Sequence, residues 1–397
     1  MIRPPFCLTT LAYGFLLTAA CGLAITGTWD DTVREEMCRQ VETAAQIPAL
    51  MADPKNETMI ASERRWQADF TREFAETLAA VHQINRRSPL LPDIFPEPAK
   101  AYVRLKFAES YRVAIGGFQR QLHAGGLPTT ADIEAAQRDI AEQVAREEEK
   151  SVESAAALRL PPPQRANSAP IDPQRYAQVM KARRIRCYAE QESFHRSPLY
   201  APGPAPLAAE IWFAQVGLWI QQDVVAAIAE LNEEAARSGP QVACVEQMPV
   251  KRIVRLRVLG YRLADRLLPF PELDTATGIV PDAGAPSPTG RMCDAEFDVV
   301  LFRLVAVVDQ RDLLQLIDRI SKQNFCVCTQ AAYAATTPAD AAAGFLYGGE
   351  PTVRVTLEFE TYLARGLYQP LMPAAIRELL GAEFHDEDGC PQSPNGG

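Results

Sequence analysis

The chain has 397 residues, which is long enough for two or three domains of ordinary size. Hydrophobic residues make up 47 % of it and charged residues 23 %, a composition typical of proteins with buried cores. The net charge of −10 excludes the broad basic surface that nucleic-acid phosphates require, so we expect no nucleic-acid partner.

Residues 1–29 are predicted to form a membrane anchor. No charged residue lies between Arg3 and Asp30, and about 20 apolar residues suffice to cross the hydrocarbon core. Arg3 precedes the apolar run while acidic residues follow it, which favours a cytoplasmic N-terminus. We therefore expect a single-pass protein of the inner (cytoplasmic) membrane with most of the chain in the periplasm. The side chains expected to anchor it are Phe6, Leu11, Phe15, Leu16, Leu17, Leu23, Ile25 and Trp29.

Two alternatives to a retained anchor remain. A cleaved signal peptide, whose apolar region is usually about 7–15 residues long, makes the protein secreted. A processing site at Leu17–Cys21 makes it a lipoprotein instead. The length of the apolar run and its continuation past Cys21 to Trp29 favour the anchor.

Residues 30–160 are predicted to form a helical stalk or coiled-coil-like region. Further helices are expected over 101–123 and from Thr130 to Leu158, on either side of a glycine-containing break. An apolar stripe at intervals of three and four suits a stalk that pairs with another helix, and the alternative is a helical subdomain that packs on itself. The stripe consists of Trp66, Phe70, Phe74, Leu78 and Val81.

Residues 161–208 are predicted to be a proline-rich linker with one short helix, Gln174–Glu192. This helix carries a basic cluster. A solvated helix face is the usual role of such a cluster, and the alternative is contact with acidic lipid or an acidic partner. The cluster consists of Lys181, Arg183, Arg184 and Arg186.

The segment Ile211–Leu231 aligns without gaps on Val300–Ile320. Phe213 then matches Phe302, and the apolar positions downstream agree as well. This alignment predicts a duplicated unit in which a buried strand leads into a helix. Asp223 matches Asp312, so both are interpreted as helix-start caps and not as catalytic residues.

Each unit is predicted to continue with further strands. The resulting fold class is α+β: an N-terminal transmembrane helix, a helical stalk or subdomain, and two tandem ferredoxin-like βαβ(β) modules. The first module is expected at 209–276 and the second at 291–383, separated by a linker at 277–290. Residues 384–397 are expected to be a disordered tail.

The last predicted strand, Pro351–Ala364, alternates apolar and polar residues. Leu357 and its apolar neighbours are expected to face the core. The polar face is predicted to belong to an exposed edge strand that recruits another strand as an interface. Its residues are Arg354, Thr356, Glu358 and Glu360.

No phosphate-binding loop, nucleophile elbow or zinc-protease motif is present. The four histidines are scattered and lack a paired carboxylate. Cys326 and Cys328 are expected to be small core residues on one strand face, and the alternative is a disulfide to a distant cysteine. We therefore predict no catalytic residue, no cofactor and no metal, and a protein that is not an enzyme.

This layout resembles the PilO/GspM-type proteins, the inner-membrane alignment components of type IV pili and type II secretion systems. The resemblance rests on the single apolar span, the helical stalk and the repeated unit at Ile211–Leu231 and Val300–Ile320. It implies a non-enzymatic scaffold that forms a homo- or heterodimer and binds protein partners of a membrane assembly. The alternative is a periplasmic small-molecule-binding or sensor module, whose ligand pocket would be lined by Trp212, Phe213 and Trp219.

Overall fold

The computed structural model describes residues 33–44, 57–98, 100–157, 171–238, 243–273, 288–336 and 338–381. The predicted membrane anchor and C-terminal tail lie outside the described residues, as does most of the linker at 277–290. The chain divides into two compact units, Met1–Leu78 and Ala79–Gly397.

The first unit is helical in its described part. A helix covers 33–44, and α2 (Glu57–Asn85) begins in this unit and ends in the next. Charged side chains of α2 form ion pairs one turn apart, such as Arg72 with Asp69 at 3.0 Å. The helices predicted for this region are confirmed within the described residues.

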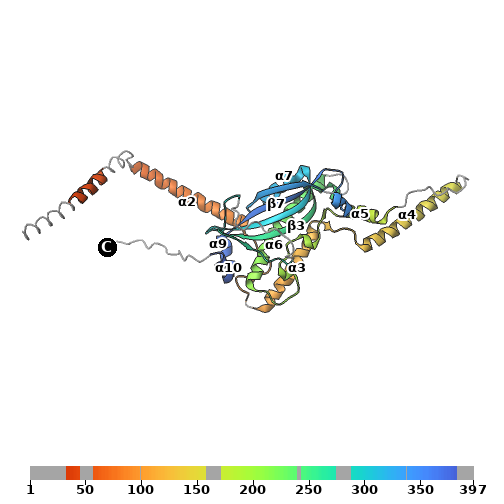
Figure 1. The fold of residues 1–397 in the computed structure, drawn as a ribbon, viewed down its shortest axis with the longest axis horizontal. Coiled ribbons are helices and arrows are strands. Elements are labelled where there is room, and N and C mark those ends of the chain that lie inside the picture. The colour runs from red at the N-terminus through yellow and green to blue at the C-terminus, as the bar shows by residue number, and fades with distance from the viewer. Residues whose placement is uncertain are drawn as a thin grey trace, which may run out of the picture. The chain divides into compact units, whose positions relative to one another are not determined.

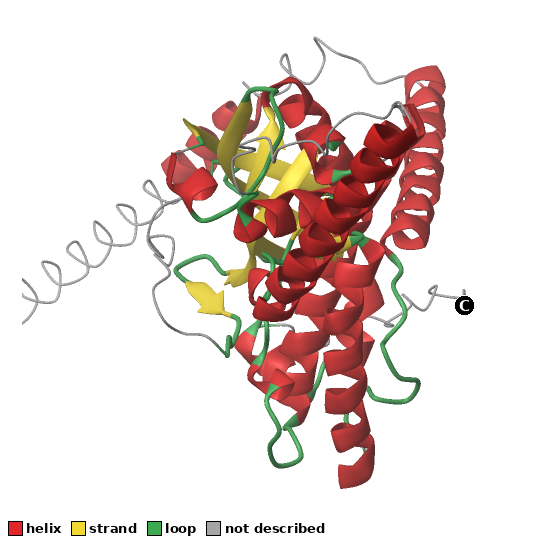
Figure 2. Cartoon of the chain, turned by 90° about the vertical axis from the view of Figure 1, so that its right-hand side faces the viewer, coloured by secondary structure: helices red, strands yellow, loops and turns green. Residues whose placement is uncertain are grey.

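The second unit combines helices with one sheet, so the predicted α+β class is confirmed at that level (Figures 1 and 2). Its helices are α3 (Ala101–Gln121), α4 (Thr130–Ala157), α5 (Pro173–Arg184), α6 (Ala208–Ser238), α7 (Leu313–Ser321), α8 (Pro338–Ala342), α9 (Arg365–Tyr368) and α10 (Ala374–Leu379). Its strands are β1 (Ala124–Gly125), β2 (Cys187–Tyr188), β3 (Val250–Arg262), β4 (Leu267–Pro269), β5 (Phe297–Asp309), β6 (Cys326–Ala335) and β7 (Thr352–Ala364).

The strands form a single sheet in the order β1-β2-β3-β5-β7-β6, with β4 paired to β3. The pairs β1–β2 and β2–β3 are parallel, and the long strands pair antiparallel. Elements from both predicted modules therefore lie side by side in one sheet, because β3 pairs with β5 along its length. The expectation that each module has a sheet of its own is wrong.

The segment 211–220 is helical, so the strand predicted there is wrong. It belongs to α6, which is 31 residues long and buried on nearly all sides. An apolar run without a polar face has no periodicity, and periodicity is what separates a buried helix from a buried strand in a sequence. Among the described residues, α6 is the one helix long and apolar enough to cross a membrane, and most of it is buried in the core.

The alignment of the two segments is structurally meaningful only in its second half. Residues 223–231 and 312–320 are helical in both copies, whereas 211–220 is helix and 300–309 is strand. Val305, Val307 and Val308 favour an extended chain, and Asp309 then caps a turn by accepting from the Arg311 amide at 3.0 Å. No such turn interrupts α6, so its helix continues through the equivalent position.

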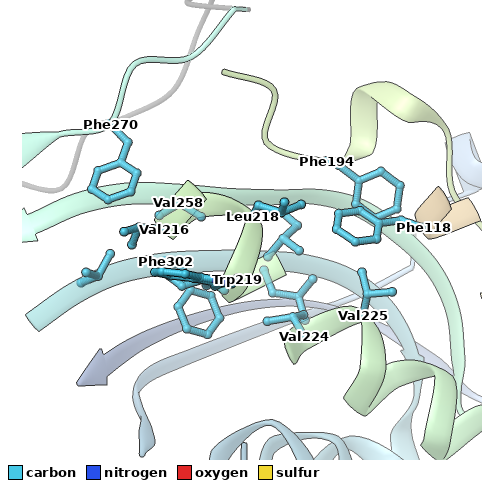
Figure 3. Close-up of a cluster of buried hydrophobic side chains, with 14 of the residues drawn as sticks. Phe118, Phe194, Val216, Leu218, Trp219, Val224, Val225, Val258, Phe270 and Phe302 are labelled. Carbon is cyan, nitrogen blue, oxygen red and sulfur yellow. The ribbon is translucent and has the colours of Figure 1, made fainter. Parts of the chain in front are cut away.

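The core lies between α6 and the inner face of the sheet (Figure 3). Leu304, Leu357 and Phe359 are fully buried there, and Phe302 stacks on Phe359 with ring centroids 5.0 Å apart. The predicted alternation along β7 is confirmed up to Glu358, since Arg354 is exposed and Glu358 half-buried. Glu360, expected on the exposed face, is fully buried and accepts a hydrogen bond from the Tyr362 hydroxyl at 3.0 Å.

Gly260 permits the close approach of β4 to β3. Its φ is +156°, and a Cβ at this position would lie 2.2 Å from the carbonyl oxygen of Leu268. Only glycine avoids that clash with backbone, which cannot move aside. The short β4 pairing at this end of β3 therefore depends on a residue without a side chain.

Candidate interaction surfaces

Helix α6 carries an anchor stripe, defined here as Gln215, Trp219 and Asp223. These residues are four apart and therefore share one face of the helix. Gln215 Oε1 accepts from the Leu90 amide at 2.8 Å, and Trp219 Nε1 donates to the Ser88 carbonyl at 2.9 Å. The anchor stripe thus holds the segment that follows α2.

Asp223 completes the anchor stripe through an ion pair with Arg87, whose side chain is 7 % exposed. Burial raises the pKa of Asp223, and the Arg87 charge opposes that rise. Asn324 joins them, because its amide accepts from Arg87 Nη2 at 3.0 Å and donates to the Ile84 carbonyl at 2.8 Å. The prediction that Asp223 caps a helix start is wrong, since it lies in the middle of a continuous helix.

Asp312 does occupy the first position before α7, as predicted. Its side chain makes no capping hydrogen bond, however. The capping carboxylate of this turn is Asp309, which accepts from the backbone and the guanidinium of Arg311. The hydrogen bond from the Arg311 side chain is the largest cause that lowers the pKa of Asp309.

The last residue of α2, Asn85, extends the same attachment to the end of β7. Its side-chain nitrogen donates to the Tyr362 carbonyl at 3.0 Å, and its oxygen accepts from the Ala364 amide at 2.8 Å. The Tyr368 hydroxyl donates to the backbone carbonyl of Asn85. The Asn85 amide therefore pairs with the stretch of β7 that extends beyond its pairing with β6.

We predict that Asn85→Ala destabilises this attachment by about 2 kcal/mol, because it removes two buried hydrogen bonds and leaves both backbone groups unpaired. Hydrogen exchange should then accelerate at the Ala364 amide and over residues 86–90. Ile84→Ala is the matched control, since Ile84 is 59 % exposed on the same turn. Equal exchange in the two variants would contradict the role assigned to Asn85.

Two further polar residues of α6 hold backbone segments. Gln221 Oε1 accepts from the His195 amide at 2.8 Å, and its nitrogen donates to the His195 carbonyl at 3.1 Å. Asn232 holds both backbone groups of Val250 in the same way, at 3.0 and 3.1 Å. Sequence reasoning missed these roles, although amide side chains within an apolar helix are a signal that something must bind them.

A buried ion pair lies where β5 begins. Arg365 Nε donates to Asp298 Oδ1 at 3.0 Å, while Asp298 Oδ2 is buried without a hydrogen-bond partner. Burial raises the pKa of Asp298 to about 6 despite the arginine. Burial likewise raises the pKa of the nearby Cys293 thiol to about 12, which disfavours the thiolate that a nucleophilic cysteine needs. The arrangement joins β5 to α9.

The aromatic residues proposed as a ligand pocket belong to the core. Trp212 and Trp219 are buried, and Trp212 Nε1 donates to the Tyr261 hydroxyl at 2.9 Å. Phe213 packs against Phe270, with ring centroids 5.1 Å apart. The predicted lining of a sensor pocket is therefore wrong, because large aromatic side chains fill this space themselves.

Part of the predicted basic cluster forms ion pairs within the chain. Lys181 pairs with Asp132 at 3.2 Å and Arg186 with Glu233, so half of the basic cluster is bound within the chain. Cys326 is buried and Cys328 half-buried, and both are free thiols. Within the described ranges, no group of three or more metal-ligating side chains lies close enough together to hold an ion.

The predicted edge strand is not at an edge. β7 lies between β5 and β6 and pairs with both, so its main-chain groups are largely occupied. The sequence shows the alternation of a strand but not its neighbours. Among the described strands, β6 forms this edge of the sheet, and residues 330–335 are all exposed.

The part of α2 in the first unit exposes an aromatic stripe, defined here as Trp66, Phe70 and Phe74. Their exposed fractions are 63 %, 58 % and 56 %. Trp66 stacks on Phe70 with ring centroids 5.6 Å apart, so these two rings form one continuous surface. The structure confirms that these residues share a helix face.

No known family model and no characterised protein sequence matches the chain. Two solved structures from Akkermansia muciniphila show weak structural similarity to the chain. The first, described as a core domain, has a TM-score of 0.27 and 7 % identity, covering 72 % of this chain and 97 % of its own. The second has a TM-score of 0.26 and 10 % identity, covering 67 % and 96 %.

Proposed function

We propose that this protein is a membrane-anchored periplasmic scaffold of the PilO/GspM type, without enzymatic activity, that acts through protein–protein contacts. The observation that carries the proposal is the aromatic stripe of α2. Three large rings at intervals of four residues are each more than half exposed. Burying each in a helix pair is worth about 1.5–3 kcal/mol, enough to hold two stalks together.

The occupant we propose for the stripe is a helix of the same kind from another membrane-anchored chain. The acidic and basic residues that alternate around α2, such as Asp69, Arg72 and Glu76, suit the flanks of such a pair. Two chains anchored in one bilayer also present their stalks side by side, which raises the effective concentration of the contact.

We further propose a ferredoxin-like module, single and not tandem. The chain runs α6-β3-β5-α7-β6-β7, and the sheet order is β3-β5-β7-β6. Strands of the two halves β5-α7-β6 and β7-α6-β3 therefore alternate across the sheet. Starting from β5, the elements follow the ferredoxin-like order β-α-β-β-α-β, with α6 and β3 moved from the end of the chain to the front.

The anchor stripe supports a scaffold role. It attaches the segment after α2 to the central helix, while Asn85 attaches the end of α2 to β7. A displacement of the end of α2 therefore reaches both the helical layer and the sheet through hydrogen-bonded contacts, as a load-transmitting scaffold requires.

The test is cross-linking in intact cells, mild detergent extraction and mass-spectrometric identification of the recovered proteins. We expect Phe70→Glu to reduce recovery of the partner chains at least about tenfold, because one buried carboxylate removes more than about 1.4 kcal/mol. Ala68→Glu is the control, since it adds the same charge on the opposite, exposed side of α2. Recovery of the wild-type chain alone, as a membrane-attached monomer, would overturn the proposal.

A further inference from the structure

We propose that two copies of this chain pair through β6, antiparallel about a two-fold axis, so that two sheets join into one. The inference rests on the proposed function only in requiring that the chain act through protein contacts. It starts from the exposure of residues 330–335 and from the absence of any charged residue between Lys322 and Asp340.

An open strand edge presents unpaired N–H and C=O groups, and proteins commonly protect such edges with lysine, proline or a bulge. Residues 330–335 contain neither lysine nor proline. The one register shift in β6 lies between Cys328 and Gln330, which leaves the second half of the strand regularly paired to β7. This half is therefore competent to accept another strand.

Charge indicates that the added strand is a second copy. A two-fold axis places every residue of β6 opposite another residue of β6, and like charges directly opposite each other would oppose pairing. β6 has no charge to oppose it. The position of Arg354 on the neighbouring strand then selects the register.

On the outer face of the sheet, Arg354 lies beside Ala334, and Glu358 lies beside Gln330. With Ala332 on the axis, Ala334 faces Gln330 of the second copy. Across the joined sheet, one row of side chains then runs from Arg354 of β7 to Ala334 of β6. It continues through Gln330 and Glu358 of the second copy. Strands are about 4.8 Å apart, so Arg354 and that glutamine are about 10 Å apart across a small alanine, within reach of two long side chains.

Neighbouring registers lose this match. If the axis moves by one residue in either direction, Gln330 or Ala334 faces Ala332 of the second copy. Arg354 is then no longer in the same row as Gln330 and Glu358 of the other sheet. Glu358 is already paired with Arg303 of β5, whose Nε donates to it at 2.9 Å, so the free partner of Arg354 in this row is Gln330 of the second copy. The register centred on Ala332 is thus the one that brings Arg354 within reach of that glutamine.

The same register covers Tyr333, which is 75 % exposed in the single chain. Tyr333 lies opposite Val355 and therefore on the inner face of the sheet. It would face Ala331 of the second copy and lie diagonally, about 7–8 Å away, from the second Tyr333. The two rings meet across the axis, which buries aromatic surface that the single chain leaves in water.

The test is Ala332→Cys in the purified full chain under mild oxidation. Directly opposed residues of antiparallel strands have Cα atoms about 4.5–5.5 Å apart, inside the range of a disulfide. We expect a covalent dimer whose linked peptides both contain position 332. Ala334→Cys is the control, because its counterpart is about 14 Å away along the strand and should not cross-link to itself.

A second variant tests the same contact without cysteine. Ala332→Lys places two ammonium groups face to face and should raise the dimer dissociation constant at least tenfold. At dilutions where both chains are monomeric, thermal melting should be unchanged because the position is exposed. No cross-link in Ala332→Cys, or equal cross-linking in both cysteine variants, would overturn the inference. If Phe70→Glu still abolishes partner recovery in that case, only the β6 pairing fails and the scaffold proposal stands.

Discussion

Leu357→Asp is expected to abolish cooperative folding of the second unit. Leu357 is fully buried in β7, opposite Leu304 of β5 and Ala331 of β6. The substitution removes a core side chain, worth about 2–5 kcal/mol, and adds the cost of an unpaired buried carboxylate of several kcal/mol. Together these reach the total stability of an ordinary domain, about 5–15 kcal/mol.

The control for this prediction is Arg354→Asp on the same strand. Arg354 points to the opposite face and is exposed, so an aspartate there should change the free energy of unfolding by no more than about 0.5 kcal/mol. Circular dichroism and limited proteolysis compare the folding of the Leu357→Asp and Arg354→Asp variants. A folded Leu357→Asp variant with unchanged melting would mean that β7 does not have this register.

The second prediction with a large effect concerns how the free energy of unfolding depends on pH. His195 is buried, and burial lowers the pKa of its imidazole from 6.5 to about 4. The folded state therefore holds neutral histidine, and its contribution to stability is full above pH 6.5 and is lost as pH falls toward 4. A shift of this size corresponds to about 3 kcal/mol.

Asp298 changes the stability in the opposite direction as the pH falls. Burial raises the pKa of its carboxyl from 3.8 to about 6, so its contribution is full below pH 3.8 and is lost as pH rises through 6. The two slopes oppose each other between pH 4 and 6. The wild-type chain should therefore show little dependence on pH from these two groups, although each alone has a large effect.

Single substitutions separate the pH-dependent contributions of His195 and Asp298. Relative to wild type, His195→Gln should gain about 2–3 kcal/mol of unfolding free energy on going from pH 7 to pH 4.5, and Asp298→Asn should lose a similar amount. Urea unfolding at both pH values measures this. His123→Asn is the control, since His123 is exposed. A parallel response of both variants to pH would contradict the opposite assignments.

Burial is the largest cause of both pKa shifts, and contacts with α6 and α9 hold the two residues in the core. His195 is held through its backbone by Gln221 of α6, and Asp298 is bound by Arg365 of α9. Neither group reaches solvent in the folded chain, where both are at most 2 % exposed. Their pKa values therefore report on the packing of the core.

Much of the local structure could be predicted from the sequence because it depends on short-range patterns. The helices α3 and α4 and the strand β7 lie close to their expected ranges, and the apolar face of β7 is the expected one. A stop such as Ala124–Gly126 or an alternation such as Val355–Leu357–Phe359 acts within a few residues. The aromatic stripe of α2 is of this kind as well.

Features that depend on long-range contacts could be determined only from the tertiary structure. Residues 211–220 belong to α6, and all of them except Phe213 are buried. A segment buried on every side has no polar–apolar period to indicate whether it is a helix or a strand. Asp223 became an anchor because Arg87, far away in sequence, lies beside it. The open edge belongs to β6 and not to β7, because strand order is set by long-range pairing, which the alternation of a single strand does not encode.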